Sequence, residues 1–151
     1  MYYVLAIIGG ALLLLTSALY GGKDRFLDRT IKGETVLSPQ WIEITPDSPL
    51  KAQRDVQAIV LYLEEPLVGD LAAGGVRMPD GSIVIPEVQL IDVDGNIYTL
   101  KYQASFGKQL VLYSDWDNLK GREYRSVRIR ADQSVRCKEI FWRCYYKKDV
   151  N

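Results

Sequence analysis

The chain has 151 residues, which is enough for one domain and a short appendage, and its acidic and basic side chains are equal in number. It contains no histidine. This removes the usual general base near neutral pH, the commonest metal ligand and any Ser-His-Asp or Cys-His mechanism. Zero net charge also gives no overall field that would attract nucleic acid. The composition therefore favours a non-enzymatic protein without a cofactor, and makes nucleic acid an unfavoured partner.

Residues 2–22 carry no charge, and tyrosines stand at both ends of the run, Tyr2 at the start and Tyr20 near the end. About 20 apolar residues in a helix cross the hydrocarbon core of a bilayer, and interfacial tyrosines are typical of such helices. The sequence therefore predicts a transmembrane anchor over residues 1–22, with the lipid bilayer as a partner. Two alternatives stay open. One is a cleaved signal peptide, with a loose cleavage site at residues 16–18 but no basic residue before the apolar run; the other is a buried soluble helix.

Basic residues follow the apolar run directly, and none precedes it: Lys23, Arg25, Arg29 and Lys32. Because an excess of Lys and Arg stays on the cytoplasmic side, we expect a single-pass protein whose globular domain is cytoplasmic, with an extracytoplasmic domain as the alternative. Residues 23–39 are expected to form a juxtamembrane linker that briefly continues the helix until Gly33 and Pro39 end it.

The remainder of the chain, residues 40–151, has the pattern of one strand after another. Residues 40–45 alternate, with Ile42 and Ile44 on one face, whereas residues 56–64 are apolar on both faces, as in a central strand that is covered on both sides. Asp94-Gly95 is a strong hairpin signal between two strands. Further strands are expected at residues 83–93, 96–104, 110–114, 126–131 and 134–148. This spacing predicts an all-β fold, a single antiparallel β-sandwich of the jelly-roll or immunoglobulin-like kind.

The two cysteines, Cys137 and Cys144, both fall in the last predicted strand. Seven residues of extended strand span roughly 23 Å, whereas a disulfide needs Cα atoms within about 7 Å. We therefore expect free, mostly buried thiols, which is weakly typical of a reducing compartment, and no zinc site. Ile140 and Trp142 alternate with Cys144, and the face that they share is expected to be core.

Two acidic clusters, residues 92–96 and 115–118, are the candidates for metal binding. An EF-hand needs a glutamate at position twelve and flanking helices. Position twelve of the first loop is Gln103 and strands flank it, so an EF-hand is excluded. No metal site is predicted, although a calcium site joining both clusters stays a minor alternative. Glu64 and Glu65 are adjacent in a strand and point to opposite faces, so they do not form a glycosidase pair.

The strongest functional signal is a basic and aromatic surface, because ten basic and three acidic residues occur between residues 120 and 148. Arg128 and Arg130 share one strand face. Arg136 and Lys138 share a face of the next strand, so cross-strand stacking would form a basic stripe. Further members are Arg122, Arg125, Lys147 and Lys148, with Tyr113, Trp116 and Tyr124 in or beside the adjoining loop. Such a surface suits a protein partner, an anionic lipid or a polyanion. The alternative is that these arginines pair with acidic residues on neighbouring strands and only solvate an outer face.

These features predict a membrane-anchored, non-enzymatic binding or scaffolding module that contacts a protein or an anionic partner near the bilayer. The loops at residues 65–82 and 113–124 are the expected contact regions, and tethering would raise the effective concentration of the partner. A second hypothesis is an exported β-sandwich that recognises carbohydrate or cell-envelope ligands, with Trp116 and Tyr124 stacking on sugar rings. Metal-assisted enzymology is disfavoured by the missing histidines.

Overall fold

The computed structural model describes residues 26–53, 56–70, 74–113 and 121–145. Within these ranges the chain forms strands and no helix, and the strands pair antiparallel. The expected all-β class and antiparallel pairing are confirmed. None of the described residues forms a helix with the length and apolarity needed to cross a membrane. The predicted anchor at residues 1–22 lies outside the described part of the chain.

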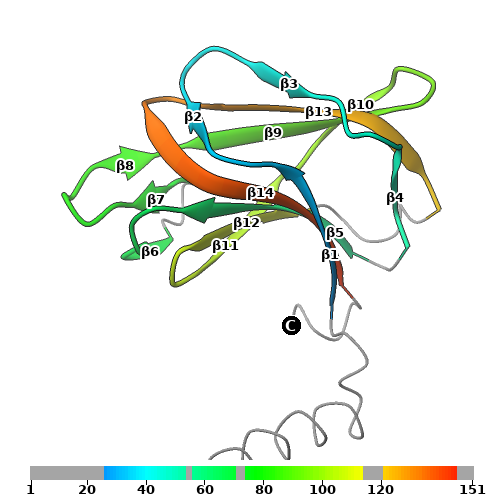
Figure 1. Cartoon of the computed structure of the whole chain (residues 1–151). Coiled ribbons are helices and arrows are strands. Elements are labelled where there is room, and N and C mark those ends of the chain that lie inside the picture. Colours follow the sequence, from blue (N-terminus) through cyan, green and yellow to red (C-terminus); the bar gives the residue numbers. More distant parts are fainter. Residues whose placement is uncertain (1–25, 54–55, 71–73, 114–120, 146–151) are drawn as a thin grey trace, which may run out of the picture.

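The strands form two large sheets and one small one (Figure 1). Sheet A has the order β1 (Phe26–Lys32), β14 (Val135–Tyr145), β5 (Val56–Leu63), β12 (Gln109–Tyr113) and β11 (Tyr102–Phe106), and β2 (Thr35–Leu37) also pairs with β14. Sheet B has the order β10 (Ile97–Thr99), β9 (Pro86–Asp92), β13 (Glu123–Ala131) and β3 (Ile42–Ile44), and β4 (Leu50–Lys51) also pairs with β13. Sheet C consists of β6 (Gly69–Asp70), β7 (Val76–Arg77) and β8 (Ile83–Val84).

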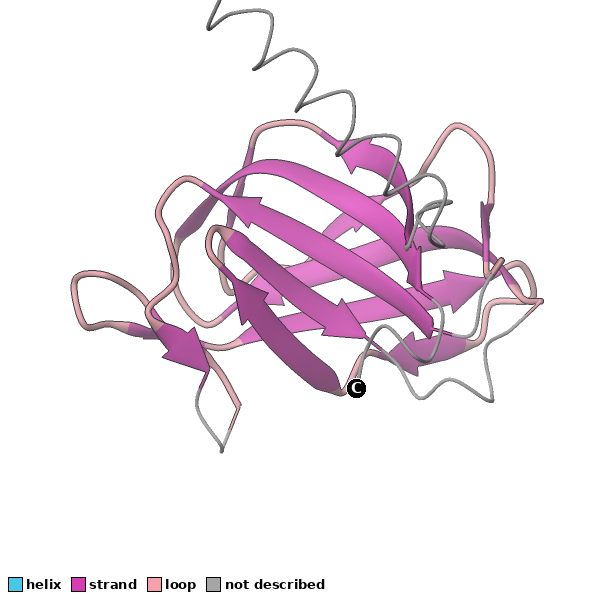
Figure 2. Ribbon diagram, turned by 90° about the horizontal axis from the view of Figure 1, so that it is seen from below, coloured by secondary structure: helices cyan, strands magenta, loops and turns pink. Residues whose placement is uncertain are grey.

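Sheets A and B pack on the two sides of one hydrophobic core. In Figure 1, β9 and β13 lie in one layer above β14, β5, β12 and β11, and the view from below in Figure 2 shows the strands of the two layers crossing. Ile59 and Ile140 of sheet A meet Val88 and Ile129 of sheet B in the same buried cluster. Strand β5 is the middle strand of sheet A and is buried on both faces, as its sequence predicted.

The predicted juxtamembrane linker at residues 23–39 is wrong in its described part. Strand β1 pairs with β14 from the Phe26–Tyr145 pair onward, and β2 adds a second pairing to the same strand. The reason is alternation: Ile31 packs against the core and Leu37 is buried in it, so this segment supplies apolar side chains to the sandwich at a period of two. The sheet thus begins at least as early as Phe26 rather than at residue 40.

The long loop predicted at residues 65–82 contains two strands of sheet C. Gln103 of β11 holds this sheet in place, because its side-chain amide accepts a hydrogen bond from the backbone N–H of Gly75 (3.2 Å) and donates one to the Gly75 carbonyl (2.6 Å). Gly75 has φ of +96°, and a Cβ at this position would lie 3.0 Å from the carbonyl oxygen of Val84. Glycine is therefore required here for both its conformation and its size.

We expect Gly75→Ala to destabilise the fold more than Gly81→Ala does. Both glycines have a positive φ, which costs an alanine about 1–2 kcal/mol, but a Cβ at Gly81 meets no atom within 4 Å. The difference between the two variants in free energy of unfolding measures the cost of the close approach to Val84, and it should be about 1 kcal/mol or more. Thermal unfolding of both variants measures it, and equal losses would show that sheet C moves aside without cost.

The two thiols are free and buried, which confirms the prediction from their spacing. Cys137 is 0% and Cys144 1% exposed. Burial raises the pKa of the Cys137 thiol to about 12, so this cysteine stays protonated and unreactive near neutral pH.

Candidate functional site

Arg128 and Arg130 lie on the outer face of sheet B, where both stack on the same indole. Their guanidinium carbons lie 4.9 Å and 4.3 Å from the ring centroid of Trp41. Arg130 also contacts both carboxylate oxygens of Glu87, at 3.2 Å and 3.0 Å, and Arg128 makes a long 3.5 Å hydrogen bond to Gln89. Arg130 therefore pairs with an acidic residue on a neighbouring strand, which is the alternative hypothesis from the sequence.

Among the described residues, Arg128 and Arg130 each have a glutamate beside them on this face. Glu87 lies beside Arg130 on β9, and Glu43 lies opposite Arg128 on β3, where its carboxylate accepts a hydrogen bond from Ser126 at 3.0 Å. Two arginines are thus accompanied by two glutamates. Such a balanced face attracts a polyanion far less than an unpaired basic stripe would.

The predicted basic stripe across two neighbouring strands is wrong. Strand β13 belongs to sheet B and β14 to sheet A, so Arg128 and Arg130 do not lie beside Arg136 and Lys138. The short turn that joins the two strands passes from one sheet to the other, and β13 has β9 and β3 as its neighbours instead. Arg136 instead forms an ion pair with Glu64, with its Nε 3.7 Å from Glu64 Oε2. Lys147 and Lys148 lie outside the described residues.

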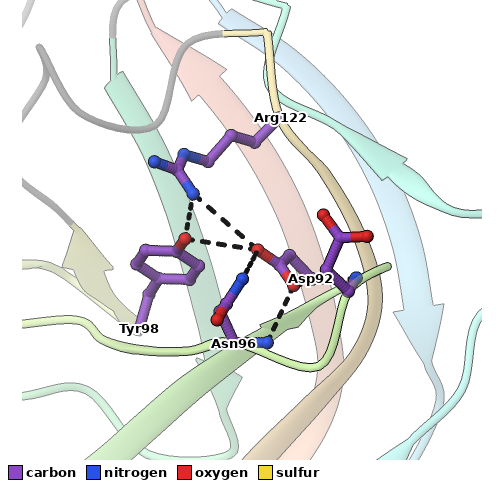
Figure 3. Close-up of polar contacts among 5 residues, drawn as sticks. Asp92, Asn96, Tyr98 and Arg122 are labelled. Atoms are coloured by element: carbon purple, nitrogen blue, oxygen red, sulfur yellow. Dashed lines mark hydrogen bonds and ion pairs between the residues drawn. The ribbon is translucent and has the colours of Figure 1, made fainter.

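Arg122 belongs to a polar cluster at the β9–β10 hairpin, drawn in Figure 3. Its Nη1 lies 3.7 Å from Asp92 Oδ2 and donates to the Tyr98 hydroxyl, and its guanidinium carbon lies 4.7 Å from the Tyr98 ring centroid. The Asp92 carboxylate also accepts hydrogen bonds from the backbone N–H groups of Asp94 (2.9 Å) and Asn96 (2.8 Å). The cluster confirms the predicted hairpin: Gly95 has φ of +91°, and its N–H donates to the Asp92 carbonyl.

Burial by itself would raise the pKa of Asp92, which is 4% exposed, but the hydrogen bonds from Asn96 and Asp94 and the charge of Arg122 outweigh it and hold the pKa below its ordinary value. A carboxylate whose pKa is depressed by folding stabilises the fold above its unfolded pKa, and this contribution is lost as the pH falls through the folded pKa. We therefore expect the urea midpoint to fall as the pH drops below about 4. Asp92→Asn should show a weaker pH dependence, and identical slopes for both proteins between pH 2 and pH 6 would contradict the assignment.

Tyr124 was predicted to be a surface residue and is instead part of the core. It is 0% exposed. Its ring lies edge-on to the Tyr98 ring, with centroids 6.1 Å apart, and its centroid is 5.6 Å from that of the Trp142 ring. The reason is a bulge in the β13–β9 pairing between Tyr124 and Ser126, which breaks the alternation and turns Tyr124 inward. Tyr124 therefore cannot stack on a sugar ring in this structure.

The hydroxyl of Tyr124 is buried and has no hydrogen-bond partner among the described residues, and burial raises its pKa. We expect Tyr124→Phe to raise the free energy of unfolding by about 1 kcal/mol, because the variant removes an unsatisfied polar group and keeps the ring. Urea unfolding measures the change. A loss of stability would reveal a partner for the hydroxyl in solution.

The remaining predicted contact residues are divided between surfaces. Arg125 is exposed, and its guanidinium lies near the Gly95 turn. Tyr113 lies on sheet A, and its ring stacks on Tyr102 with centroids 5.5 Å apart. Trp116 and the acidic cluster at residues 115–118 lie outside the described part of the chain. Among the residues that the structure does describe, no group of three acidic or cysteine side chains could hold a metal ion.

The sequence did not reveal the outer face of sheet A, which we call the tyrosine face. It carries the side chains of Thr30, Ala58, Val60, Tyr62, Tyr102, Ala104, Phe106, Gln109, Val111, Tyr113, Glu139, Phe141, Arg143 and Tyr145, with Asp28 at its edge. Small residues occupy its centre: Ala58, Val60 and Val111 are nearly fully buried and form a cluster separate from the main core. Aromatic rings surround them, and the most exposed are Tyr102 at 45% and Phe106 at 63%.

A buried arginine is the polar centre of the tyrosine face. Arg143 is 5% exposed, and its Nε and Nη2 contact the two carboxylate oxygens of Asp28 at 2.5 Å and 2.7 Å. Its Nη1 donates to Gln109 at 3.0 Å and to the Tyr145 hydroxyl at 3.2 Å. Burial by itself would lower the pKa of Arg143, but the hydrogen bonds to Asp28 and Tyr145 outweigh it and the pKa is raised. The charge is thus neutralised within the face.

One sequence signal pointed to this surface. Residues 56–64 are apolar on both faces of their strand, so side chains other than those of the main core must cover its outer face. Tyr113, Phe141 and Tyr145 pack on that second side. Comparison with known proteins adds no assignment, because no family model and no curated protein matches the chain.

Proposed function

We propose that the protein is a membrane-anchored, non-enzymatic binding module, a β-sandwich that contacts a protein partner through the tyrosine face. The observation that carries the proposal is the composition of this face: tyrosine and phenylalanine side chains around one buried arginine. Tyrosine, phenylalanine and arginine are the residue types enriched at protein interfaces, and aromatic and arginine side chains supply most of the binding energy there.

The size of the tyrosine face supports the same partner class. It extends over five strands, which at roughly 4.8 Å between strands gives a width of about 20 Å. Two of its rings, Tyr102 and Phe106, are exposed, and exposed aromatic side chains that gather on one face commonly mark interaction sites. The outer face of sheet B, with its two arginines balanced by two glutamates, is the weaker candidate for a contact surface.

The apolar run at residues 2–22 supports the anchor. Strand β1 begins four residues after this run at one edge of sheet A, so the anchor would hold the tyrosine face close to the bilayer. The basic residues after the run favour a cytoplasmic domain. The carbohydrate alternative is weakened because Tyr124, one of its two proposed stacking residues, is buried.

Fractionation of the full-length protein tests the anchor. We expect the intact chain, with its mass including residues 1–18, to sediment with membranes and to remain there after washing at high pH. Recovery of the uncleaved chain from the aqueous fraction without detergent would refute the anchor, and a mature mass that lacks residues 1–18 would show a cleaved signal instead.

A further inference from the structure

A cleft of about 360 Å³ opens between β1 of sheet A and the segment around β4 of sheet B. Figure 1 shows β1 and β4 at the same end of the molecule. Trp142 and Cys144 form the floor of the cleft, Leu27 and Arg29 line it from β1, and Ser48, Pro49 and Gln53 line it from the other side. Asp28 and Lys51 complete the lining.

The floor of the cleft is fixed by hydrogen bonds between the two sheets. The indole N–H of Trp142 donates to the carbonyl oxygen of Lys51 at 3.2 Å, and the thiol of Cys144 donates to the same oxygen at 3.6 Å. Both side chains are nearly fully buried, at 4% and 1% exposure. The cleft is therefore an opening between two sheets that are tied together at its base, with a shape set by the fold.

Of the three charged residues in the lining, two are neutralised by neighbours. Asp28 pairs with Arg143, and the ammonium group of Lys51 lies 3.6 Å from Glu123. Arg29 makes one long hydrogen bond, at 3.4 Å, to the carbonyl oxygen of Pro49, and no carboxylate of the described residues pairs with it. Its guanidinium thus keeps donors for an anion, and the same cleft is lined by Ser48 and Gln53, two residue types whose side chains carry neutral donors.

We propose that this cleft binds the phosphate group of a phospholipid headgroup, with Arg29 as the principal ligand. Guanidinium groups bind phosphate in a bidentate, charge-assisted manner, and an unpaired arginine is suited to this. The position of the cleft supplies the source of the phosphate, since Leu27 follows the last residue of the apolar run, Gly22, by five residues. Five residues extend over at most about 18 Å, so the proposed anchor would hold the cleft close to the headgroups. This inference rests on the proposed anchorage.

The rival explanation for Arg29 is protection of an edge strand. A charged side chain that points inward on an edge strand prevents pairing with another chain. In that case Arg29 would have no ligand, and its replacement would change self-association but not phosphate binding.

Titration of the full-length protein in neutral detergent micelles tests the proposal by calorimetry. The probes are dihexanoyl phosphatidylglycerol, dihexanoylglycerol, which lacks the phosphate, and inorganic phosphate. We expect the phosphatidylglycerol probe to bind, dihexanoylglycerol not to bind, and inorganic phosphate to bind at least tenfold more weakly. Equal affinity for inorganic phosphate would overturn the lipid assignment, and a wild-type protein that does not bind phosphatidylglycerol would overturn the site itself.

Two variants locate the binding. Arg29→Gln should weaken phosphatidylglycerol binding at least tenfold, whereas Arg130→Gln, at an arginine on the outer face of sheet B, should leave it unchanged. A cooperative urea transition for each variant establishes that both are folded. Unchanged binding by Arg29→Gln would overturn the proposal in favour of edge protection. Because the probes are short lipids in micelles, the titration measures binding to the cleft whether or not the protein is anchored in a membrane.

Discussion

Asp28→Ala is expected to lower the free energy of unfolding by about 3 kcal/mol, because it leaves the guanidinium of Arg143 buried without a carboxylate. The Arg143 side chain is 6% exposed and that of Asp28 is 31% exposed, which places the loss near the lower end of the range for a buried pair. Urea unfolding of the full-length protein in micelles, followed by tryptophan fluorescence, measures the change. Asp28 lies at the edge of the tyrosine face, so the variant should also loosen that surface.

Glu87→Ala is the matched control for Asp28→Ala. Glu87 and Arg130 form a pair at 3.0 Å in the other sheet, but their side chains are 47% and 36% exposed. Solvent screens such a pair, and its removal should cost about 1 kcal/mol or less. Equal losses for the two variants would contradict the view that Arg143 is a buried charge that depends on Asp28.

Trp142→Ala is expected to lower the free energy of unfolding by about 3–5 kcal/mol, more than Asp28→Ala does. The side chain is 4% exposed in the main core, contacts the Tyr124 ring and joins the two sheets through the Lys51 carbonyl. Trp142→Phe keeps most of the buried area and loses the hydrogen bond, so it should cost about 1–2 kcal/mol. Thermal and urea unfolding both report the difference.

Trp41→Ala provides the surface comparison. Trp41 lies on the outer face of sheet B under Arg128 and Arg130, and its loss removes cation–π contacts worth about 1 kcal/mol. If Trp41→Ala proved as destabilising as Trp142→Ala, the outer face of sheet B would be part of the folding core rather than a solvated surface.

Local patterns in the sequence were sufficient to predict most of the strands and several of the core residues. The alternation of Ile140, Trp142 and Cys144 predicted a buried face, and all three side chains are buried. The apolar residues on both sides of β5 predicted a central strand, which is its place in sheet A. These features depend on periods of two residues within one strand, and a single sequence shows them directly. The jelly-roll and immunoglobulin-like alternatives both remain predictions.

The surfaces could not be predicted, because they depend on which strands pair. Arg130 and Arg136 appeared to be neighbours because their strands are consecutive, yet the turn between them changes sheets. The bulge between Tyr124 and Ser126 turns the Tyr124 side chain toward the core, and no pattern of residues in the sequence predicts this bulge. The tyrosine face assembles residues from five strands, such as Tyr102, Ala58 and Arg143, which come together only when the register is known.

Site-specific photo-cross-linking in intact membranes is the most direct test of the proposed module. A photoreactive residue at Tyr102 samples the tyrosine face, and one at Ile97 samples sheet B from a site of similar exposure, 54% against 45%. We predict a discrete cross-linked protein from position 102 and none from position 97. Absence of any adduct at position 102, or the same adducts from both positions, would contradict a protein partner on the tyrosine face.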